Sequence, residues 1–153
     1  MYRYLCALVA LIVSLAGCAT YPDLNRQRLE NLPHHYSQFD ALLSWEERPV
    51  GDQLLVDGVY KNIRWDYEDN IEIWVAVLSP AGKILARSVS FVIPQELRLD
   101  EMAPFSLKLP VRAAPGLKLR FTYKYRASEG SSQEGAGRID WMQSFDTELS
   151  ARP

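Results

Sequence analysis

The sequence predicts an all-β domain, an antiparallel sandwich of two sheets. Apolar side chains recur at every second position from 71 to 77, which is the period of a strand with one buried face. The four residues that follow include Pro80 and Gly82, which favour a tight reversal of the chain. A second strand-like segment, 83–91, comes after this turn. The two segments therefore predict a central β-hairpin.

Five further segments complete the prediction of about seven strands. In 117–126 the alternation is most regular, with apolar side chains on one side and mostly Lys and Arg on the other, which indicates a half-exposed strand. Gly58, in the middle of 53–61, indicates a bulge or a closely approaching neighbour. Short strands separated by turn signals predict an immunoglobulin-like β-sandwich, with a partly open barrel as the alternative. These segments are 39–46, 53–61, 105–109, 117–126 and 139–145.

The N-terminal segment has the organisation of a secretory signal. A weakly basic start around Arg3 precedes an apolar stretch at residues 5–15. This stretch is shorter than the roughly 20 residues that a membrane-spanning helix needs, but it has the length of a signal-peptide core. The tetrapeptide Leu15-Ala16-Gly17-Cys18 follows at once.

Residues 1–18 resemble the signal of bacterial lipoproteins, in which signal peptidase II cuts before the cysteine of a motif such as L-A-G-C. The resemblance implies attachment of lipid to the Cys18 sulfur and acylation, for example with palmitate, of the new amino terminus. Two or three acyl chains anchor a protein stably, whereas one binds only marginally. Ala19, rather than Asp, follows the cysteine, which favours the outer membrane over the inner membrane. An ordinary signal with a coincidental Cys18 is the alternative.

The chain is expected to have four parts. Because Cys6 is removed with the signal and Cys18 is lipidated, the mature domain should contain neither a free thiol nor a disulfide. A short helix within 19–33 is the alternative to an extended tether. The parts are a cleaved signal peptide at 1–17, a lipidated N-terminus and tether at 18–37, the sandwich at 38–149 and a loose tail at 150–153.

The middle of the chain resembles the FxLYD-type bacterial immunoglobulin-like domain. The resemblance rests on the order GVYKN (58–62), SPAGKIL (79–85) and EMAPFSLKLP (101–110), and it spans about half of the chain. It implies an exported accessory domain without known chemistry.

Charge and motifs point away from several classes of function. A net charge of −2 over 153 residues gives no reason to expect a nucleic-acid partner. No Gly-x-Ser-x-Gly motif occurs, and a Ser/His/Asp triad would need His34 or His35, both on the tether side. We therefore expect a non-enzymatic protein without a cofactor.

No metal site is expected either. His34 and His35 are adjacent, so their side chains should diverge in extended chain, and we expect the end of a polar linker or a helix cap there. The acidic residues of the 62–70 loop offer oxygen ligands for Ca²⁺, but their spacing does not match the EF-hand loop. A solvated acidic loop is therefore expected, with calcium binding as the alternative.

Two features are candidate partner-binding sites. Trp65 and Tyr67 lie in the 62–70 loop, where they would stack on a sugar or anchor a protein contact, or else fold over the end of the sandwich. The second feature is a row of cations, which would meet an anionic partner or else be paired across strands with Asp and Glu. This basic stripe comprises Lys118, Arg120, Lys124 and Arg126.

Together these observations predict a non-catalytic lipoprotein on the periplasmic side of the outer membrane. Its membrane contact is the lipid on Cys18, and its role is to hold or assemble a protein partner of the cell envelope. The alternative is a carbohydrate- or small-ligand-binding module that uses Trp65 and Tyr67.

Overall fold

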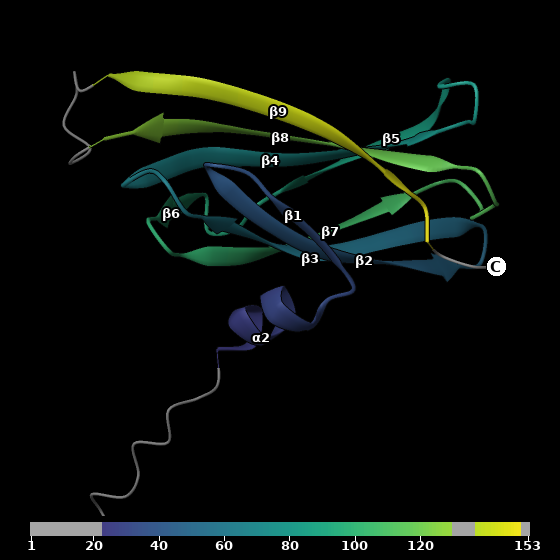
Figure 1. Ribbon diagram of the computed structural model, residues 1–153, viewed down its shortest axis with the longest axis horizontal. Helices are drawn as coiled ribbons and strands as arrows, with labels where there is room; N and C mark the ends of the chain where they lie inside the picture. Colours follow the sequence, from purple (N-terminus) through teal and green to yellow (C-terminus); the bar gives the residue numbers. More distant parts are fainter. Residues whose placement is uncertain (1–22, 130–136, 151–153) are drawn as a thin grey trace, which may run out of the picture.

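Two antiparallel sheets pack face to face in the computed structural model, which describes residues 23–129 and 137–150 (Figure 1). Sheet A has the strand order β1-β2-β3-β7, and sheet B has the order β5-β4-β8-β9, with the short β6 also paired to β4. The elements are α2 (Leu24–Asn31), β1 (His34–Ser37), β2 (Ala41–Val50), β3 (Gln53–Asn62), β4 (Tyr67–Leu78), β5 (Ile84–Phe91), β6 (Glu96–Arg98), β7 (Met102–Leu109), β8 (Lys118–Ser128) and β9 (Arg138–Glu148).

The core lies between the sheets, where the alternation of the sequence predicted it. Every second side chain of β8 from Leu119 to Tyr125 is buried, and the same holds for β4 from Ile71 to Val77. These two strands pair with each other in the middle of sheet B. The predicted class, an immunoglobulin-like antiparallel β-sandwich, is confirmed.

The central hairpin forms at the predicted turn. Gly82 has a positive φ of 79°, and its N–H donates to the Ser79 carbonyl at 2.8 Å. The Ser79 N–H in turn donates to the Lys83 carbonyl at 2.8 Å. A positive φ costs glycine little because it has no Cβ, so the residue that predicted the turn is also the one that makes it possible.

The predicted close approach at Gly58 is also present. A Cβ added there would overlap the Phe105 ring and the Ser44 carbonyl oxygen. Gly58 lies opposite Trp45 in β2 and Phe105 in β7. The glycine therefore allows the Phe105 ring to lie directly on the backbone of β3.

The start of the domain is corrected by the structure. The segment 18–37 was expected to be a tether, yet β1 pairs with β2 in register, with Tyr36 opposite Leu43. The helix α2 also contacts β2, β3 and β7. The helix α2 and the strand β1 thus belong to the folded body, and β1 and β6 bring the number of strands in the described part of the chain to nine.

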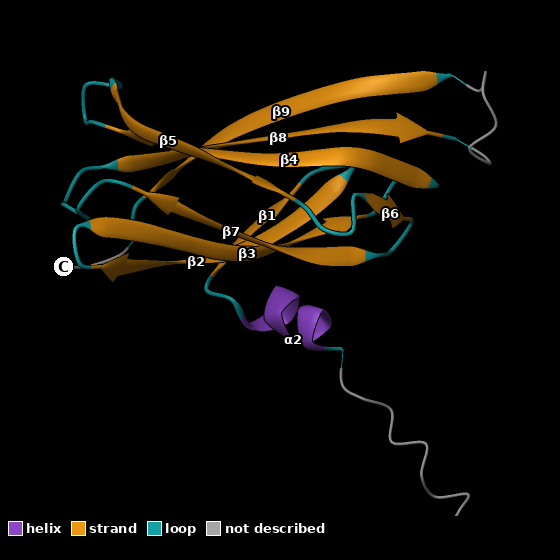
Figure 2. Cartoon of the chain, turned by 180° about the vertical axis from the view of Figure 1, so that it is seen from behind, coloured by secondary structure: helices purple, strands orange, loops and turns teal. Residues whose placement is uncertain are grey.

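The helix α2 covers the outer face of sheet A (Figure 2). The Ser44 hydroxyl donates to the Leu29 carbonyl at 2.6 Å. Ser44 and Val59 are both buried, although neighbouring positions on their strands supply the inner face. The outer face of sheet B has no such covering element among the helices and strands described.

Aromatic side chains close the side of the sandwich between the edge strands β1 and β9. The Tyr36 ring stacks on the Phe145 ring with 3.7 Å between centroids and 6° between planes. Phe145 stacks in turn on Phe121 of the core at 5.2 Å. Since β1 and β9 belong to different sheets, this stack joins the two sheets through side chains.

Candidate functional site

The basic stripe lies on the outer face of β8 and is largely paired across strands. Arg120 makes two contacts with Asp146 of β9, at 2.6 and 2.8 Å, and these hydrogen bonds lower the pKa of Asp146. Arg126 bonds to Asp140 at 3.0 Å. The cross-strand alternative considered for the stripe is therefore the arrangement found for these cations.

The other two cations of the stripe also have acidic neighbours. Lys124 lies 3.6 Å from the Glu72 carboxylate of β4, and Lys118 is opposite Glu148 in the register of β8 and β9. Paired charges at a solvated surface attract an anionic partner less strongly than free charges. The stripe thus offers alternating charges rather than a field of one sign.

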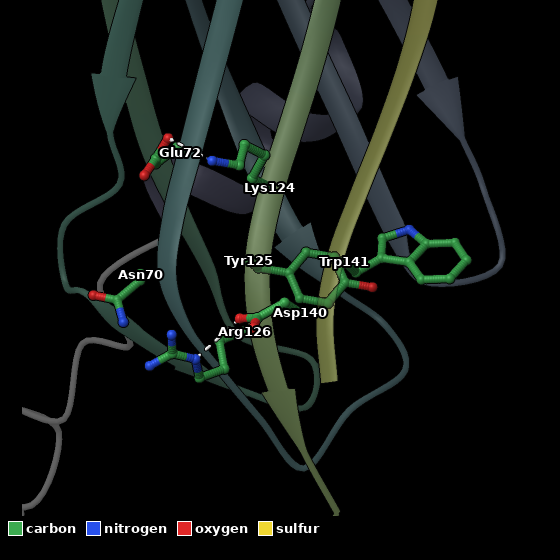
Figure 3. A pocket seen from close by; sticks show the side chains of 7 residues that line it. All are labelled: Asn70, Glu72, Lys124, Tyr125, Arg126, Asp140 and Trp141. Atoms are coloured by element: carbon green, nitrogen blue, oxygen red, sulfur yellow. Dashed lines mark hydrogen bonds and ion pairs between the residues drawn. The ribbon is translucent and has the colours of Figure 1, made fainter. Parts of the chain in front are cut away.

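A surface depression of about 250 Å³ includes part of this stripe (Figure 3). Its walls carry the Lys124–Glu72 and Arg126–Asp140 pairs, with Asn70 at one side. Asn70 has a positive φ of 52° at the point where the register of β4 and β8 shifts. The depression joins donors and acceptors of both signs.

Trp65 lies in the interior of the protein. Only 8% of it is exposed, and its indole N–H donates to the Tyr125 hydroxyl at 3.0 Å. Of the two alternatives for Trp65, stacking on a sugar is therefore wrong. The ring folds over the end of the sandwich, where its N–H has a buried partner. Tyr67 is half-buried, with the Arg98 guanidinium 5.7 Å from its ring centre.

The segment that was expected to be an acidic loop is partly strand. Asn62 is buried and organises its start: its side-chain oxygen accepts from the N–H groups of Arg64 and Trp65 at 3.0 and 3.1 Å. From Tyr67 onward the chain belongs to β4, which turns Glu68 into the interior. The acidic side chains of this segment therefore do not share one surface.

The two histidines diverge as expected, but in a strand rather than a linker or helix cap. His34 stacks on Trp45 at 5.4 Å and lies 2.9 Å from the Glu47 carboxylate. Next to it, His35 places its Nδ1 atom 3.1 Å from the Ser44 hydroxyl. No group of three or more potential metal ligands occurs among residues 23–129 and 137–150.

The most unusual polar feature is a buried cluster that sequence analysis did not single out. Asp40, between β1 and β2, accepts hydrogen bonds from the hydroxyls of Tyr123 and Tyr125 at 2.9 and 2.7 Å. Tyr60 of β3 donates to Glu68 of β4 at 2.8 Å. These five residues, the tyrosine–carboxylate cluster, connect the two sheets. The only signal was the position of three tyrosines on inward faces.

Glu68 is the exceptional member of the cluster. Burial, and secondarily the charge of Asp40, raise the pKa of Glu68 from 4.5 to about 8, although the bond from Tyr60 acts in the opposite direction. Its second carboxyl oxygen, Oε1, has no hydrogen-bond partner. Burial likewise raises the pKa of Tyr60, Tyr123 and Tyr125. Glu68 is therefore a largely protonated carboxyl group inside the fold at neutral pH.

The outer face of sheet B carries exposed apolar side chains beside the charged rows. Trp74 is half-buried there, with the Arg87 guanidinium 5.4 Å from its ring and its N–H bonded to Glu72 at 2.6 Å. Phe91 on β5 is 60% exposed and Met142 on β9 is 62% exposed. Phe91 and Met142 lie in one row across the sheet and are separated by Glu72 and Lys124.

Comparison with known proteins gives likeness of fold alone. No protein-family model matches the chain, and no curated protein matches it in sequence. The resemblance to FxLYD-type domains therefore stays a prediction. A Bordetella pertussis protein described as ApaA is similar over 72% of this chain and 94% of its own, with 14% identity and a TM-score of 0.47.

Two further solved structures are similar to part of the chain. The GAE domain of GGA2p from Saccharomyces cerevisiae matches over 74% of this chain and 96% of its own, with 8% identity and a TM-score of 0.44. A β-glucuronidase of Bacteroides uniformis matches 72% of this chain but only 13% of its own length, with 15% identity and a TM-score of 0.37. Likenesses at this level say nothing about a ligand or partner.

The membrane contact expected at Cys18 lies outside the described residues. Over the part of the chain that the structure describes, no helix is long and apolar enough to cross a bilayer.

Proposed function

We propose that this protein is a non-catalytic lipoprotein of the outer membrane that holds a protein partner on its periplasmic side. The observation that carries the proposal is the tetrapeptide Leu15-Ala16-Gly17-Cys18 directly after a short apolar segment. Acyl chains on Cys18 anchor the domain, since two or three chains together bind a bilayer stably.

The partner-binding role is supported by the asymmetry of the sandwich. The helix α2 covers the outer face of sheet A, whereas the outer face of sheet B presents Trp74, Phe91 and Met142 to solvent. Aromatic and Met side chains are enriched at protein interfaces. Phe91 and Met142 lie at opposite edges of one row of the sheet, with the Glu72–Lys124 pair between them, so the contact surface would alternate apolar and charged side chains.

Labelling with radioactive palmitate tests the anchor. The wild-type protein should incorporate the label and fractionate with outer membranes, and Cys18→Ala should do neither. Cys6→Ala is the matched control, because Cys6 lies in the predicted signal and should be dispensable for acylation. Incorporation of palmitate into the Cys18→Ala variant would contradict the lipoprotein proposal.

Crosslinking in cells tests the partner surface. Phe91→Ser should reduce recovery of the crosslinked partner several-fold, because it removes an exposed apolar side chain from sheet B. Val50→Ser is the control, since Val50 is 54% exposed at the far end of β2 in sheet A. Equal losses in both variants would remove sheet B from the proposal.

The basic stripe needs a separate variant. Exchanging Arg120 with Asp146 keeps the ion pair but reverses the local order of charges, so the fold should be retained. Reduced recovery of the partner in this double variant would assign the stripe to the interface. Unchanged recovery would leave the apolar surface alone as the contact.

A further inference from the structure

The helix α2 is held against sheet A, so the position of its first residue on the sandwich is defined. The Ser44 hydroxyl donates to the Leu29 carbonyl at 2.6 Å. Val59, beneath the helix on sheet A, has no exposed surface. Asp23 caps the first turn, accepting from the N–H groups of Asn25 and Arg26 at 3.1 and 3.2 Å. The capped start of α2 is therefore a defined point on the sheet A side.

The distance from this point to the proposed lipid is short. Four residues separate Cys18 from Asp23. Five residue steps of at most about 3.3–3.6 Å span no more than roughly 18 Å. If Cys18 is acylated, Asp23 must stay within this distance of the lipid attachment point. The helix α2 that begins there lies on the outer side of sheet A (Figure 1).

A groove of about 360 Å³ lies beside this end of the helix. Three large apolar residues that directly precede or follow groove-lining residues in the sequence are exposed. They are Leu24 at 68%, Ile93 at 74% and Leu99 at 46%. The groove itself is lined by Asp23, Arg26, Pro94, Leu97, Asp100, Glu101 and Met102.

The chemistry of this corner fits the headgroup region of a bilayer. Exposed apolar side chains gain free energy when they enter the boundary between headgroups and acyl chains. The groove carries one cation, Arg26, among the carboxyl groups of Asp23, Asp100 and Glu101, so it does not favour strongly anionic lipid. A zwitterionic phospholipid surface satisfies both features.

We propose that the corner formed by the start of α2 and the segment 93–102 docks on the phospholipid surface, with Leu24, Ile93 and Leu99 among the headgroups. This inference rests on the proposed acylation of Cys18. Docking there leaves the outer face of sheet B directed away from the membrane, where a partner can reach it. The lipid thereby does more than tether the domain, since the short linker and the fixed helix also orient it.

Fluorescence quenching in vesicles tests the orientation. The predicted mature chain has no other thiol than the acylated Cys18, so a single cysteine can be labelled at Leu99→Cys or, as the matched control, at Met142→Cys. Both sites are exposed: Leu99 directly follows β6, and Met142 lies on the outer face of sheet B. The acylated protein is placed in vesicles of the zwitterionic lipids phosphatidylethanolamine and phosphatidylcholine that carry a spin label on the headgroup.

The label at position 99 should be quenched more strongly than the label at 142, because Leu99 belongs to the proposed docking corner and Met142 lies on the outer face of sheet B. Ile93→Ser should weaken quenching at 99, whereas Ile84→Ser, at a site of 53% exposure on β5, should leave it unchanged. Equal quenching at 99 and 142, or stronger quenching at 142, would overturn the inference.

Flotation separates this inference from the proposal on which it rests. Wild-type protein that fails to float with vesicles would overturn the anchor and the docking together. Protein that floats but shows no quenching at 99 would overturn the docking alone.

Discussion

At the scale of single residues, Glu68 makes the stability of the fold depend on pH. The pKa of Glu68 is raised to about 8 in the folded state, against an ordinary value of 4.5. Between these two pH values the folded protein therefore retains a proton that the unfolded chain has lost. The stabilisation is complete below pH 4.5 and is lost as the pH rises towards 8. Because each pKa unit corresponds to 1.36 kcal/mol, the loss is on the order of a few kcal/mol.

Glu68→Gln should abolish this dependence. The amide keeps the shape of the side chain and an oxygen that accepts from Tyr60, but it has no charged form, so it should stabilise the protein at pH 8 relative to wild type. Urea unfolding at pH 5, 6.5 and 8 measures the effect. Glu96→Gln, at an exposed site on β6, is the control and should leave the wild-type profile unchanged. A Glu68→Gln protein with the wild-type profile would contradict the assignment.

At Gly58 the neighbouring atoms leave no room for a side chain. In Gly58→Ala the new Cβ would meet both the Phe105 ring and the Ser44 carbonyl oxygen, and the carbonyl belongs to a paired strand that cannot move alone. We expect a loss of about 3 kcal/mol in the free energy of unfolding, at the upper end of typical overpacking.

Gly137→Ala is the control for that substitution, since nothing lies within 4 Å of a Cβ at Gly137. Its midpoint in urea should equal that of wild type. A Gly58→Ala protein that unfolds at the wild-type midpoint would show that β3 and β7 separate more easily than their packing suggests.

Residues with a local signal were predictable, and residues that depend on distant partners were not. Gly58 and Gly82 stand out against their own neighbours in the sequence, and both do what the pattern predicted. Trp65 is buried because its N–H reaches Tyr125, 60 positions later. Asp40 is buried because it meets Tyr123, 83 positions later. No window of sequence contains these pairs.

At the scale of elements, α2 depends on sheet A for its stability. The helix has eight residues, none of them buried, and helices this short are marginal in water without tertiary contacts. Ser44→Ala removes the hydrogen bond to the Leu29 carbonyl and should cost about 1 kcal/mol. Amide exchange in α2 should accelerate, while exchange in β8 stays slow.

Ser37→Ala is the control for that experiment, because Ser37 is exposed at the end of β1. Its amide exchange should match wild type throughout. If α2 exchanged at the wild-type rate in Ser44→Ala, the contacts over Val59 alone would suffice to hold the helix.

The contrast between local sequence signals and distant partners also explains which elements were predicted. The seven expected strands carry an apolar alternation that burial between two sheets imposes, and all seven occur. The missed strands, β1 and β6, have four and three residues, too few to show a period. They exist because one edge of β2 is open to β1, and because the first residues of β4 extend beyond its pairing with β5 and are open to β6. Both openings are properties of the assembled sheets.

At the scale of the whole molecule, the sandwich has one side closed by rings instead of strands. Tyr36 of sheet A and Phe145 of sheet B stack at 3.7 Å, and Phe145 continues the stack to Phe121 in the core. Since the predicted mature chain contains no disulfide, this contact is one of the few direct connections between the edge strands of the two sheets.

A double-mutant cycle measures that connection. Tyr36→Ala and Phe145→Ala should each destabilise the protein, and the double variant should lose about 1 kcal/mol less than the two losses together, the range measured for aromatic pairs. Tyr67→Ala combined with Phe145→Ala is the control cycle, because Tyr67 contacts Arg98 rather than the stack, and its losses should add. Additive losses for Tyr36 and Phe145 would mean that each ring packs on its own sheet, and that the sheets are held together by the core and the tyrosine–carboxylate cluster alone.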